Sequence, residues 1–423
     1  MAKIDDSVKN KVPELRFKGF TDDWEERKLE DTSEIIDGDR GKNYPSGDDF
    51  KNNGHTLFLS AANVTKQGFV FKETQYITKL KSESLGSGKV ILNDIILTSR
   101  GSIGHIGFYD KKTHEYIPQA RINSGMLILR TDKLNSPSFI AQFLKSPWGI
   151  KQIKLISFGS AQPQLTKKDI KNFKIILPKM EEQKKIGSFF KQLDDTITLH
   201  QRKLDLLKEQ KKGYLQKMFP KNGAKVPELR FAGFTDAWEE HKLGELSNIV
   251  GGGTPSTSNS EYWDGDIDWY APAEIGEQRY VSKSKKTITE LGLKKSSARI
   301  LPVGTVLFTS RAGIGNTAIL GKEATTNQGF QSIVPNPNKL DSYFIYSRTN
   351  ELKRYGEVTG AGSTFVEVSG KQMSKMSIMI PELSEQKKIG SFFKQLDNTI
   401  ALHQRKLDLL KEQKKGYLQK MFV

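Results

Sequence analysis

The chain contains no cysteine among its 423 residues. Without thiols it has no disulfide framework, no cysteine-ligated zinc finger and no cysteine nucleophile, and a reducing compartment suits it. No stretch approaches the roughly 18 consecutive apolar residues of a membrane-spanning helix, and the first ten residues, MAKIDDSVKN, contain no apolar segment. We therefore expect a cytoplasmic protein in which residues 1–11 form a flexible leader.

The sequence also lacks an intact catalytic motif. The stretch Gly86-Ser87-Gly88-Lys89 resembles a phosphate-binding loop, but the first glycine of the motif is missing and Val90 stands where Ser or Thr would bind magnesium. The six histidines have no metal-ligand spacing. Helicase motifs and an aromatic Asn/Asp-Pro-Pro loop for holding adenine are missing as well. We predict no catalytic residue, no metal site and no cofactor bound by this chain.

The tripeptide Glu-Gln-Lys, which resembles the end of a nuclease motif, starts at positions 182, 209, 385 and 412. All four copies fall in long helical repeats, so a solvent-exposed helix face is the simpler explanation.

The charge is strongly basic, with 66 Lys and Arg against 49 Asp and Glu, a formal net charge of +17. An excess of this size attracts polyanions, of which nucleic acid is the most common. A solvated lysine surface without a specific partner is the alternative.

Residues 182–219 are repeated at 385–422 with 36 of 38 positions identical. In each copy a row of mostly apolar residues recurs at alternating spacings of four and three, which is the seam of a coiled coil. In the first copy this seam comprises Ile186, Phe190, Leu193, Ile197, His200, Leu204, Leu207, Lys211, Tyr214 and Met218. We expect two helices, each about 57 Å long at 1.5 Å per residue, packed antiparallel. Parallel packing would need a domain that spans the whole helix length.

Polar residues interrupt the seam at His200 and Lys211, and at their counterparts His403 and Lys414. We interpret them as a register device or as side chains that extend to solvent, in preference to a histidine metal site.

Each half also opens with a repeated segment. Residues 12–30, VPELRFKGFTDDWEERKLE, match residues 226–244 at 15 of 19 positions, and Trp24 and Trp238 are expected to anchor these opening segments in a core. The organisation is then a first domain (12–178), a first spacer helix (179–219), a linker (220–225), a second domain (226–381) and a second spacer helix (382–423).

The two middle regions diverge but share a skeleton of short motifs. An apolar strand at 90–97 enters the loop Thr98-Ser99-Arg100-Gly101, and one at 301–308 enters Thr309-Ser310-Arg311-Ala312. Asn123-Ser124-Gly125 matches Asn327-Gln328-Gly329, and Gly159-Ser160 matches Gly362-Ser363. Segments 136–156 and 341–355 have helical patterns. We predict α/β or α+β domains with short strands.

The Ser-Arg loops suit DNA. Arginine bonds bidentately to guanine, glutamine to adenine, and glycine lets backbone amides approach phosphates. A structural salt bridge for the arginines, and a simple turn for the glutamines, are the alternatives. The candidate DNA-binding residues are Ser99, Arg100, Gly101, Ser102, Ser160, Gln162, Gln164, Ser310, Arg311, Ala312, Asn316, Ser363 and Thr364.

Taken together, the alternation of variable domain, repeated helix ending in LLKEQKKGYLQKMF, second variable domain and helix again resembles the DNA-specificity subunit of type I restriction-modification systems. The resemblance covers nearly the whole chain and includes the Thr-Ser-Arg loops. It implies two target-recognition domains, each recognising one half of a split DNA sequence, and a pseudo-twofold internal repeat whose antiparallel helices act as a spacer.

The resemblance also implies partners and their cofactors. Two modification subunits would bind S-adenosylmethionine and methylate adenine at N6, and two restriction subunits would use ATP and magnesium to move along double-stranded DNA and cleave it. The specificity subunit itself would be non-catalytic. The residues expected to form the spacer and its docking surface are Phe189, Phe190, Leu193, Ile197, Leu204, Leu207, Phe392, Phe393, Leu396, Ile400, Leu407 and Leu410.

Two other classes of function are open. A methyltransferase fused to its recognition module would need the cofactor and adenine motifs that are missing. A coiled-coil DNA-binding adaptor without sequence specificity would have no reason to vary its domains while preserving its helices.

Overall fold

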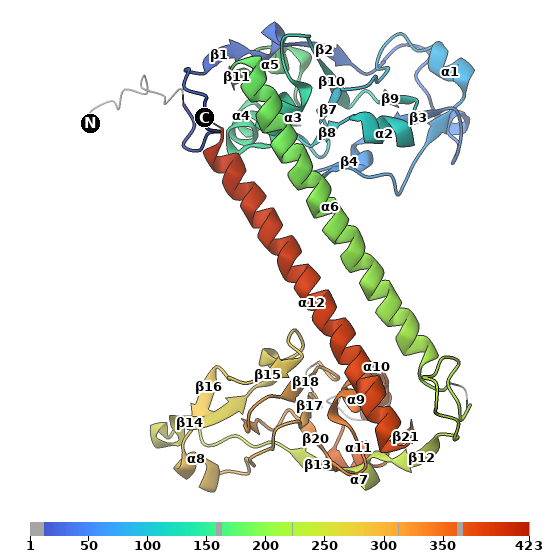
Figure 1. The fold of residues 1–423 in the computed structure, drawn as a ribbon, viewed down its shortest axis with the longest axis vertical. Coiled ribbons are helices and arrows are strands. Elements are labelled where there is room, and N and C mark those ends of the chain that lie inside the picture. Colours follow the sequence, from blue (N-terminus) through green and yellow to red (C-terminus); the bar gives the residue numbers. More distant parts are fainter. Residues whose placement is uncertain (1–11, 158–162, 222, 312, 362–366, 423) are drawn as a thin grey trace. The chain divides into compact units, whose positions relative to one another are not determined.

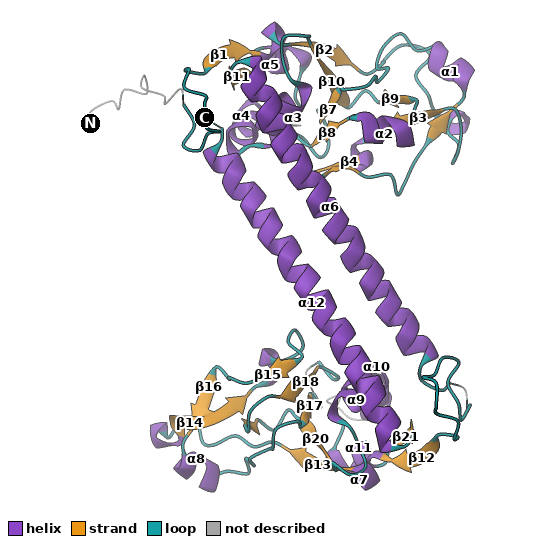
Figure 2. Cartoon of the chain, viewed as in Figure 1, coloured by secondary structure: helices purple, strands orange, loops and turns teal. Residues whose placement is uncertain are grey.

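The computed structural model describes residues 12–157, 163–221, 223–311, 313–361 and 367–422 (Figures 1 and 2). The chain divides into two compact units, Met1–Gln201 with Arg405–Val423, and Arg202–Gln404. Each unit therefore contains one opening segment, one diverged middle region and parts of both long helices. Within the described residues no helix is long and apolar enough to cross a membrane.

The two repeated segments form the helices α6 (Met180–Lys217) and α12 (Leu383–Lys420). In the first unit the ring of Phe189 in α6 lies 5.0 Å from that of Tyr417 in α12. In the second unit the equivalent pair, Tyr214 and Phe392, is also 5.0 Å apart. The start of each helix thus contacts the end of the other, which confirms antiparallel packing.

The predicted seam is confirmed position by position. All ten seam residues of the first repeat and their ten counterparts in the second are buried or half-buried. The polar seam residue Lys211 pairs with Asp397 at 2.7 Å, and Lys414 pairs with Asp194 at 2.5 Å. Because a seam lysine reaches a carboxylate only when the helices are correctly aligned, these two ion pairs support the interpretation of a register device.

The first unit has a mixed α+β domain. Its main sheet runs in the antiparallel order β2 (Ser33–Asp37), β10 (Met126–Thr131), β7 (Ile95–Thr98), β8 (Ile106–Phe108). A second sheet has the order β6 (Tyr76–Ile77), β3 (Thr56–Leu59), β9 (Ala120–Ile122), with β3 and β9 parallel. Two further antiparallel pairs are β1 (Glu25–Lys28) with β11 (Lys174–Leu177) and β4 (Val64–Thr65) with β5 (Gly68–Phe69). The helices are α1 (Lys79–Glu83), α2 (Lys111–Tyr116), α3 (Pro137–Lys145), α4 (Pro147–Ser157) and α5 (Lys167–Lys171), with 3-10 turns at Leu29–Asp31, Gly47–Asp49 and Ala61–Asn63.

The second unit repeats this topology. Its main sheet runs β13 (Ser247–Gly251), β20 (Gln331–Pro335), β17 (Val306–Phe308), β18 (Thr317–Leu320), and then adds β15 (Tyr280–Val281) parallel to β18. The second sheet has the order β16 (Lys286–Ile288), β14 (Trp263–Tyr270), β19 (Thr325–Thr326), again with one parallel pair. The pair β12 (Glu239–Lys242) and β21 (Ser377–Ile380) corresponds to β1 and β11. The helices are α7 (Leu243–Leu246), α8 (Glu290–Lys294), α9 (Ser342–Ser347), α10 (Thr349–Gly360) and α11 (Gly370–Ser374), with 3-10 turns at Ser260–Tyr262 and Pro272–Glu274. The α+β expectation is confirmed for both domains.

Several predicted elements are shorter than expected. The helix predicted over 136–156 breaks at Ser146, whose extended backbone precedes Pro147, and the helix predicted over 341–355 breaks at Arg348. The apolar run 90–97 pairs as a strand only from Ile95, because Asn93 adopts a positive φ of 72° in a turn. Apolar composition alone did not distinguish a buried strand from the exposed turn before it.

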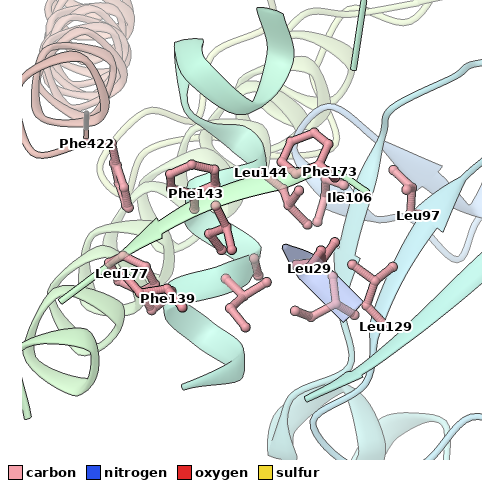
Figure 3. Close-up of a cluster of buried hydrophobic side chains, with 14 of the residues drawn as sticks. Leu29, Leu97, Ile106, Leu129, Phe139, Phe143, Leu144, Phe173, Leu177 and Phe422 are labelled. Carbon is pink, nitrogen blue, oxygen red and sulfur yellow. The ribbon is translucent and has the colours of Figure 1, made fainter. Parts of the chain in front are cut away.

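A phenylalanine after each long helix completes a domain core. In the first unit Phe422, which follows α12, lies 5.4 Å from Phe139 and 5.8 Å from Phe143, measured between ring centroids (Figure 3). Its ring centroid is 6.4 Å from that of Trp24. In the second unit Phe219, which follows α6, lies 6.1 Å from Trp238. Both tryptophans are 1% exposed, which confirms their predicted anchoring role.

Each opening segment is held by a buried ion pair. Arg16 donates two hydrogen bonds of 2.7 Å to Glu182 in α6, and Arg230 donates bonds of 2.8 and 2.7 Å to Glu385 in α12. These carboxylates are 1% and 0% exposed.

The neighbouring glutamines are buried too. Gln183 donates to the carbonyl of Pro178 at 2.9 Å, and Gln386 donates to that of Pro381 at 2.9 Å. The expected solvent-exposed helix face is therefore wrong for the Glu-Gln-Lys copies at 182 and 385. Both lie in the first turns of the helices, where the domain and opening segment cover them. In the copies at 209 and 412 the glutamate and the glutamine are exposed, whereas the lysines are the half-buried seam residues Lys211 and Lys414.

Candidate nucleic-acid interface

The Thr-Ser-Arg loops follow β7 and β17 and are closed in the same way. Thr98 Oγ1 accepts a hydrogen bond of 2.9 Å from the backbone amide of His105 and donates to the carbonyl of Ser102. Thr309 Oγ1 accepts one of 2.9 Å from the amide of Asn316 and donates to the carbonyl of Gly313 at 2.8 Å. The threonine hydroxyl thus folds each loop back on its own strand.

A glycine in each loop allows a helix to approach. Gly104 has a φ of 81°, and a Cβ there would lie 2.8 Å from Ile153 of α4. Gly315 has a φ of 98°, and a Cβ there would lie 2.3 Å from Lys353 of α10. Both the backbone conformation and the space require glycine.

A second turn lies against each loop, as the matched Asn-x-Gly motifs indicated. The amide of Ser99 donates to the carbonyl of Gly125 at 2.8 Å, and that of Ser310 to Gly329 at 2.8 Å. Within the turns, the amides of these glycines donate to the side chains of Asn123 at 3.0 Å and Asn327 at 2.7 Å. The asparagine side chain therefore closes the Asn-x-Gly turn and fixes the position of the residue in the middle of the turn.

A third segment approaches each loop from the C-terminal side of the domain. The amide of Leu165 donates to the carbonyl of Ser99 at 3.0 Å, and the amide of Val368 donates to that of Ser310 at 3.0 Å. The predicted residues Ser160, Gln162, Ala312, Ser363 and Thr364 lie outside the described residues.

The chain after the first strand of each main sheet completes the arrangement. Gly38, after β2, comes so close to the turn that a Cβ would lie 2.1 Å from the carbonyl oxygen of Asn123. Gly252, after β13, is in the same place, 1.9 Å from that of Asn327. The sequence reasoning missed this segment, although a glycine immediately after a β-rich run is a recognisable sign of close backbone approach.

The predicted arginines lie on the loops at different exposures. Arg100 is exposed, and its Nε donates to Oε1 of Gln164 at 3.2 Å, so these two predicted residues come together. Arg311 is half-buried and its backbone bridges to Glu367. Gly101 and Asn316 are exposed, and Ser102 is half-buried.

The two serines differ from expectation. Ser99 is 2% exposed and Ser310 is 0% exposed, so neither hydroxyl faces solvent. Their backbone groups hold the second turn and the third segment against the loop. Both serines thus position the loop through their backbones, and a direct DNA contact by their side chains stays a prediction.

The glycine-rich stretch 86–88 holds a carboxylate of this chain. The amide of Gly86 donates to Oδ2 of Asp39 at 2.7 Å, and the amide of Gly41 donates to Oδ1 at 2.7 Å. Burial raises the pKa of Asp39, but these and neighbouring backbone amides outweigh it and lower the pKa below its usual value. Asp39 precedes Arg40, whose Nη2 donates to the carbonyl of Ser124 at 3.3 Å.

The residues predicted for the spacer helices are all covered, and Phe190 and Phe393 among them belong to the domain cores. Six are buried and six are half-buried, the latter being Phe189, Leu193, Ile197, Phe392, Leu396 and Ile400. A direct docking role for these side chains stays a prediction. The sequence reasoning missed four exposed leucines at repeated positions, Leu199 and Leu402 at 68% and 67% exposure and Leu206 and Leu409 at 53% and 49%.

Among the described residues, no three His, Asp or Glu side chains gather in a way that could hold a metal ion.

Comparisons with known proteins match both halves of the chain. The family model described as type I restriction modification DNA specificity domain matches residues 21–209 and again 235–412. The type I restriction enzyme MjaIX specificity subunit of Methanocaldococcus jannaschii is 36% identical over 178 residues, 41% of this chain and 41% of that protein. The putative MjaX specificity subunit of the same organism is 25% identical over 93% of this chain and 91% of its own length.

Among solved structures, the type I restriction-modification system S subunit from M. genitalium has a similar fold. The TM-score is 0.65 at 15% sequence identity, covering 97% of this chain and 99% of that one.

Proposed function

Because this chain belongs to the type I restriction-modification DNA specificity family, we propose that it recognises a bipartite DNA target, one half-site with each set of paired loops. The observation that carries this proposal is the loop frame itself. Two domains with little common sequence hold a Thr-Ser-Arg loop and an Asn-x-Gly turn by the same backbone hydrogen bonds. Two domains that recognise different half-sites need the same loop backbone with different residues around it, and this is the arrangement found.

Arg100 and Arg311 are the proposed primary DNA contacts. A guanidinium at this position can bond bidentately to guanine or bind a phosphate, and only the first distinguishes sequences. The basic composition of the chain would add sequence-independent affinity that weakens with salt.

We test the recognition role with the complex formed by this chain and its modification subunit, assayed by methylation and by DNA binding. Arg311→Ala should weaken binding to the specific site by about 1–3 kcal/mol and relax one position of one half-site. The control is Arg405→Ala, which removes the same charge from an exposed position of α12. Equal losses on all sequences would make Arg311 a phosphate contact, and an effect no larger than that of the control would reject a DNA contact.

We further propose that α6 and α12 set the gap between the half-sites. The seam ion pairs that fix the helix register support this role. Inserting one heptad into each helix should change the preferred gap in methylation mapping. An unchanged gap would remove the spacer function.

Docking of modification subunits is the remaining part of the proposal. The exposed leucines occur at equivalent positions of two nearly identical helices, which suits one partner bound twice. Leu199→Glu combined with Leu402→Glu should abolish co-purification with the modification subunit. The control pair Gln210→Glu and Gln413→Glu, exposed on the same helices, should not. Retained co-purification of the leucine variant would exclude this face.

A further inference from the structure

The matched frames differ at several positions, and two of these positions contact each other. In the Asn-x-Gly turn the middle residue is Ser124 in the first unit and Gln328 in the second. Two residues beyond the close-approach glycines, Arg40 in the first unit corresponds to Thr254 in the second. The flanking asparagine, glycine, threonine and arginine residues are the same in both units, so at these two positions equivalent backbones carry different side chains.

These two positions contact each other in both units. Nη2 of Arg40 donates to the carbonyl of Ser124 at 3.3 Å, and Oγ1 of Thr254 donates to Oε1 of Gln328. Both contacts lie at the same place in the frame, because Gly38 and Gly252 bring their segments against the same carbonyl of the turn. The third residue after the first strand therefore contacts the middle residue of the turn in both units, through the backbone of Ser124 in the first and through the side chain of Gln328 in the second.

The pair lies beside the loop arginine. A Cβ on Gly125 would lie 3.6 Å from Cβ of Arg100, and one on Gly329 would lie 3.6 Å from Nε of Arg311. The middle residue of the turn is thus next in sequence to a glycine that touches the arginine side chain. Gln328 is exposed and Ser124 is half-buried.

From this arrangement we propose that residues 124 and 328 are specificity-determining positions, and that Gln328 recognises an adenine in the half-site of the second domain. The inference rests on the proposed function. Glutamine bonds bidentately to N6 and N7 of adenine, and the hydroxyl of Thr254 holds the amide group in one orientation. Serine is too short for that bidentate contact, so in the first domain Arg40 supplies the second long donor beside Arg100.

Thr254 is a positioning residue in this scheme. It contacts Gln328 and is half-buried. Thr254→Val should weaken the preference for adenine without creating a preference for another base. Thr254→Ser, which keeps the hydroxyl, should retain the preference for adenine.

The test is methylome sequencing of cells that express this chain with its modification partner. Gln328→Ser should relax a single A·T pair of one half-site, with discrimination against other bases falling about 5- to 150-fold, the usual range for one bidentate contact. The other half-site and the gap should not change. Gln413→Ser, the same substitution at an exposed position of α12, is the matched control and should leave both half-sites as they are.

Three outcomes of Gln328→Ser would overturn the inference: unchanged half-sites, relaxation of a G·C pair, and equal loss of methylation at all sites. Thermal unfolding of the purified variant shows whether a loss arises from misfolding. In that case Ser124→Gln decides alone. It should introduce an adenine preference at one position of the other half-site, and no change there would reject the role of the position. A wild-type chain that directs no bipartite methylation would instead reject the proposed function.

Discussion

The two units use the same residue of the repeated helix with different domain partners. Asp194 in the first unit accepts hydrogen bonds from Gln142 at 3.0 Å and from Lys414 at 2.5 Å. Its counterpart Asp397 in the second unit accepts one of 2.9 Å from the hydroxyl of Tyr343 and pairs with Lys211 at 2.7 Å.

The difference shows which contacts can vary. The lysine comes from the other copy of the helix and is the same in both units, whereas the domain contributes an amide in one case and a phenol in the other. Burial, and then the neighbouring Asp397 carboxylate, raise the pKa of Tyr343, so that its hydroxyl stays a donor. A domain can therefore change its sequence as long as it offers one donor to this carboxylate.

The largest expected effect concerns the phenylalanines that complete the cores. Phe422→Ala should destabilise the first unit by about 3–5 kcal/mol, because it leaves a cavity among Trp24, Phe139 and Phe143. Phe219→Ala should do the same to the second unit. Hydrogen exchange measured along the chain distinguishes the two, since each variant should lose protection in the unit that its phenylalanine fills. Loss of protection in the opposite unit would contradict this assignment.

A slightly smaller effect is expected at the ion pairs of the opening segments. Arg16→Ala leaves Glu182 as an uncompensated charge at 1% exposure and should cost about 3 kcal/mol. Arg230→Ala should cost a similar amount through Glu385. The double change Arg16→Met with Glu182→Leu should recover most of the loss in the denaturant midpoint. No recovery would mean that the pair acts through something other than charge burial.

Substitution of the equivalent aspartates Asp194 and Asp397 should destabilise the two units to different extents. Asp397→Asn should cost about 2 kcal/mol, because the side chain is 7% exposed and accepts from both Lys211 and Tyr343. Asp194→Asn should cost less than about 1 kcal/mol, because its side chain is 36% exposed and solvent screens the pair. Hydrogen exchange gives the local unfolding free energy of each unit in the two variants. Equal losses of stability would show that the exposure of the aspartate does not control the strength of its ion pair.

The smallest effect is a pH dependence confined to the first unit. Burial, and then the nearby Lys414, lower the pKa of Lys145 to about 8, with Asp194 acting in the opposite direction. A lysine in the unfolded chain has a pKa of about 10.4, so between these values the unfolded state holds more protons and stability rises with pH. The folded form should gain about 1 kcal/mol between pH 7.5 and 9.

Lys145→Met is the control for this prediction and should flatten the dependence of the melting temperature on pH. The corresponding helix α9 of the second unit contains no lysine. A slope that persists in the variant would assign the titration to another group.

Repetition and periodicity made much of this architecture predictable. The spacing of Ile186, Phe190 and Leu193 depends only on the geometry of one helix, so the seam followed from local pattern. The antiparallel packing was predicted because parallel packing would need a domain that spans the whole helix length. The loop motifs around Arg100 and Arg311 were matched by their identical residues, and in the structure equivalent hydrogen bonds hold both loops. The breaks at Ser146 and Arg348 were missed, because the residues on either side of each break favour a helix.

The sequence by itself determined that two unlike domains alternate with two copies of one helix, because a 36-of-38 repeat and a seam of fixed period are local properties. Only the tertiary structure decided that Phe422 enters the first core and Phe219 the second, that Ser99 and Ser310 face inward, and that Glu182 is buried. These outcomes depend on which distant segment covers a side chain. Such burial arises only when the whole chain packs, so no local stretch of sequence specifies it.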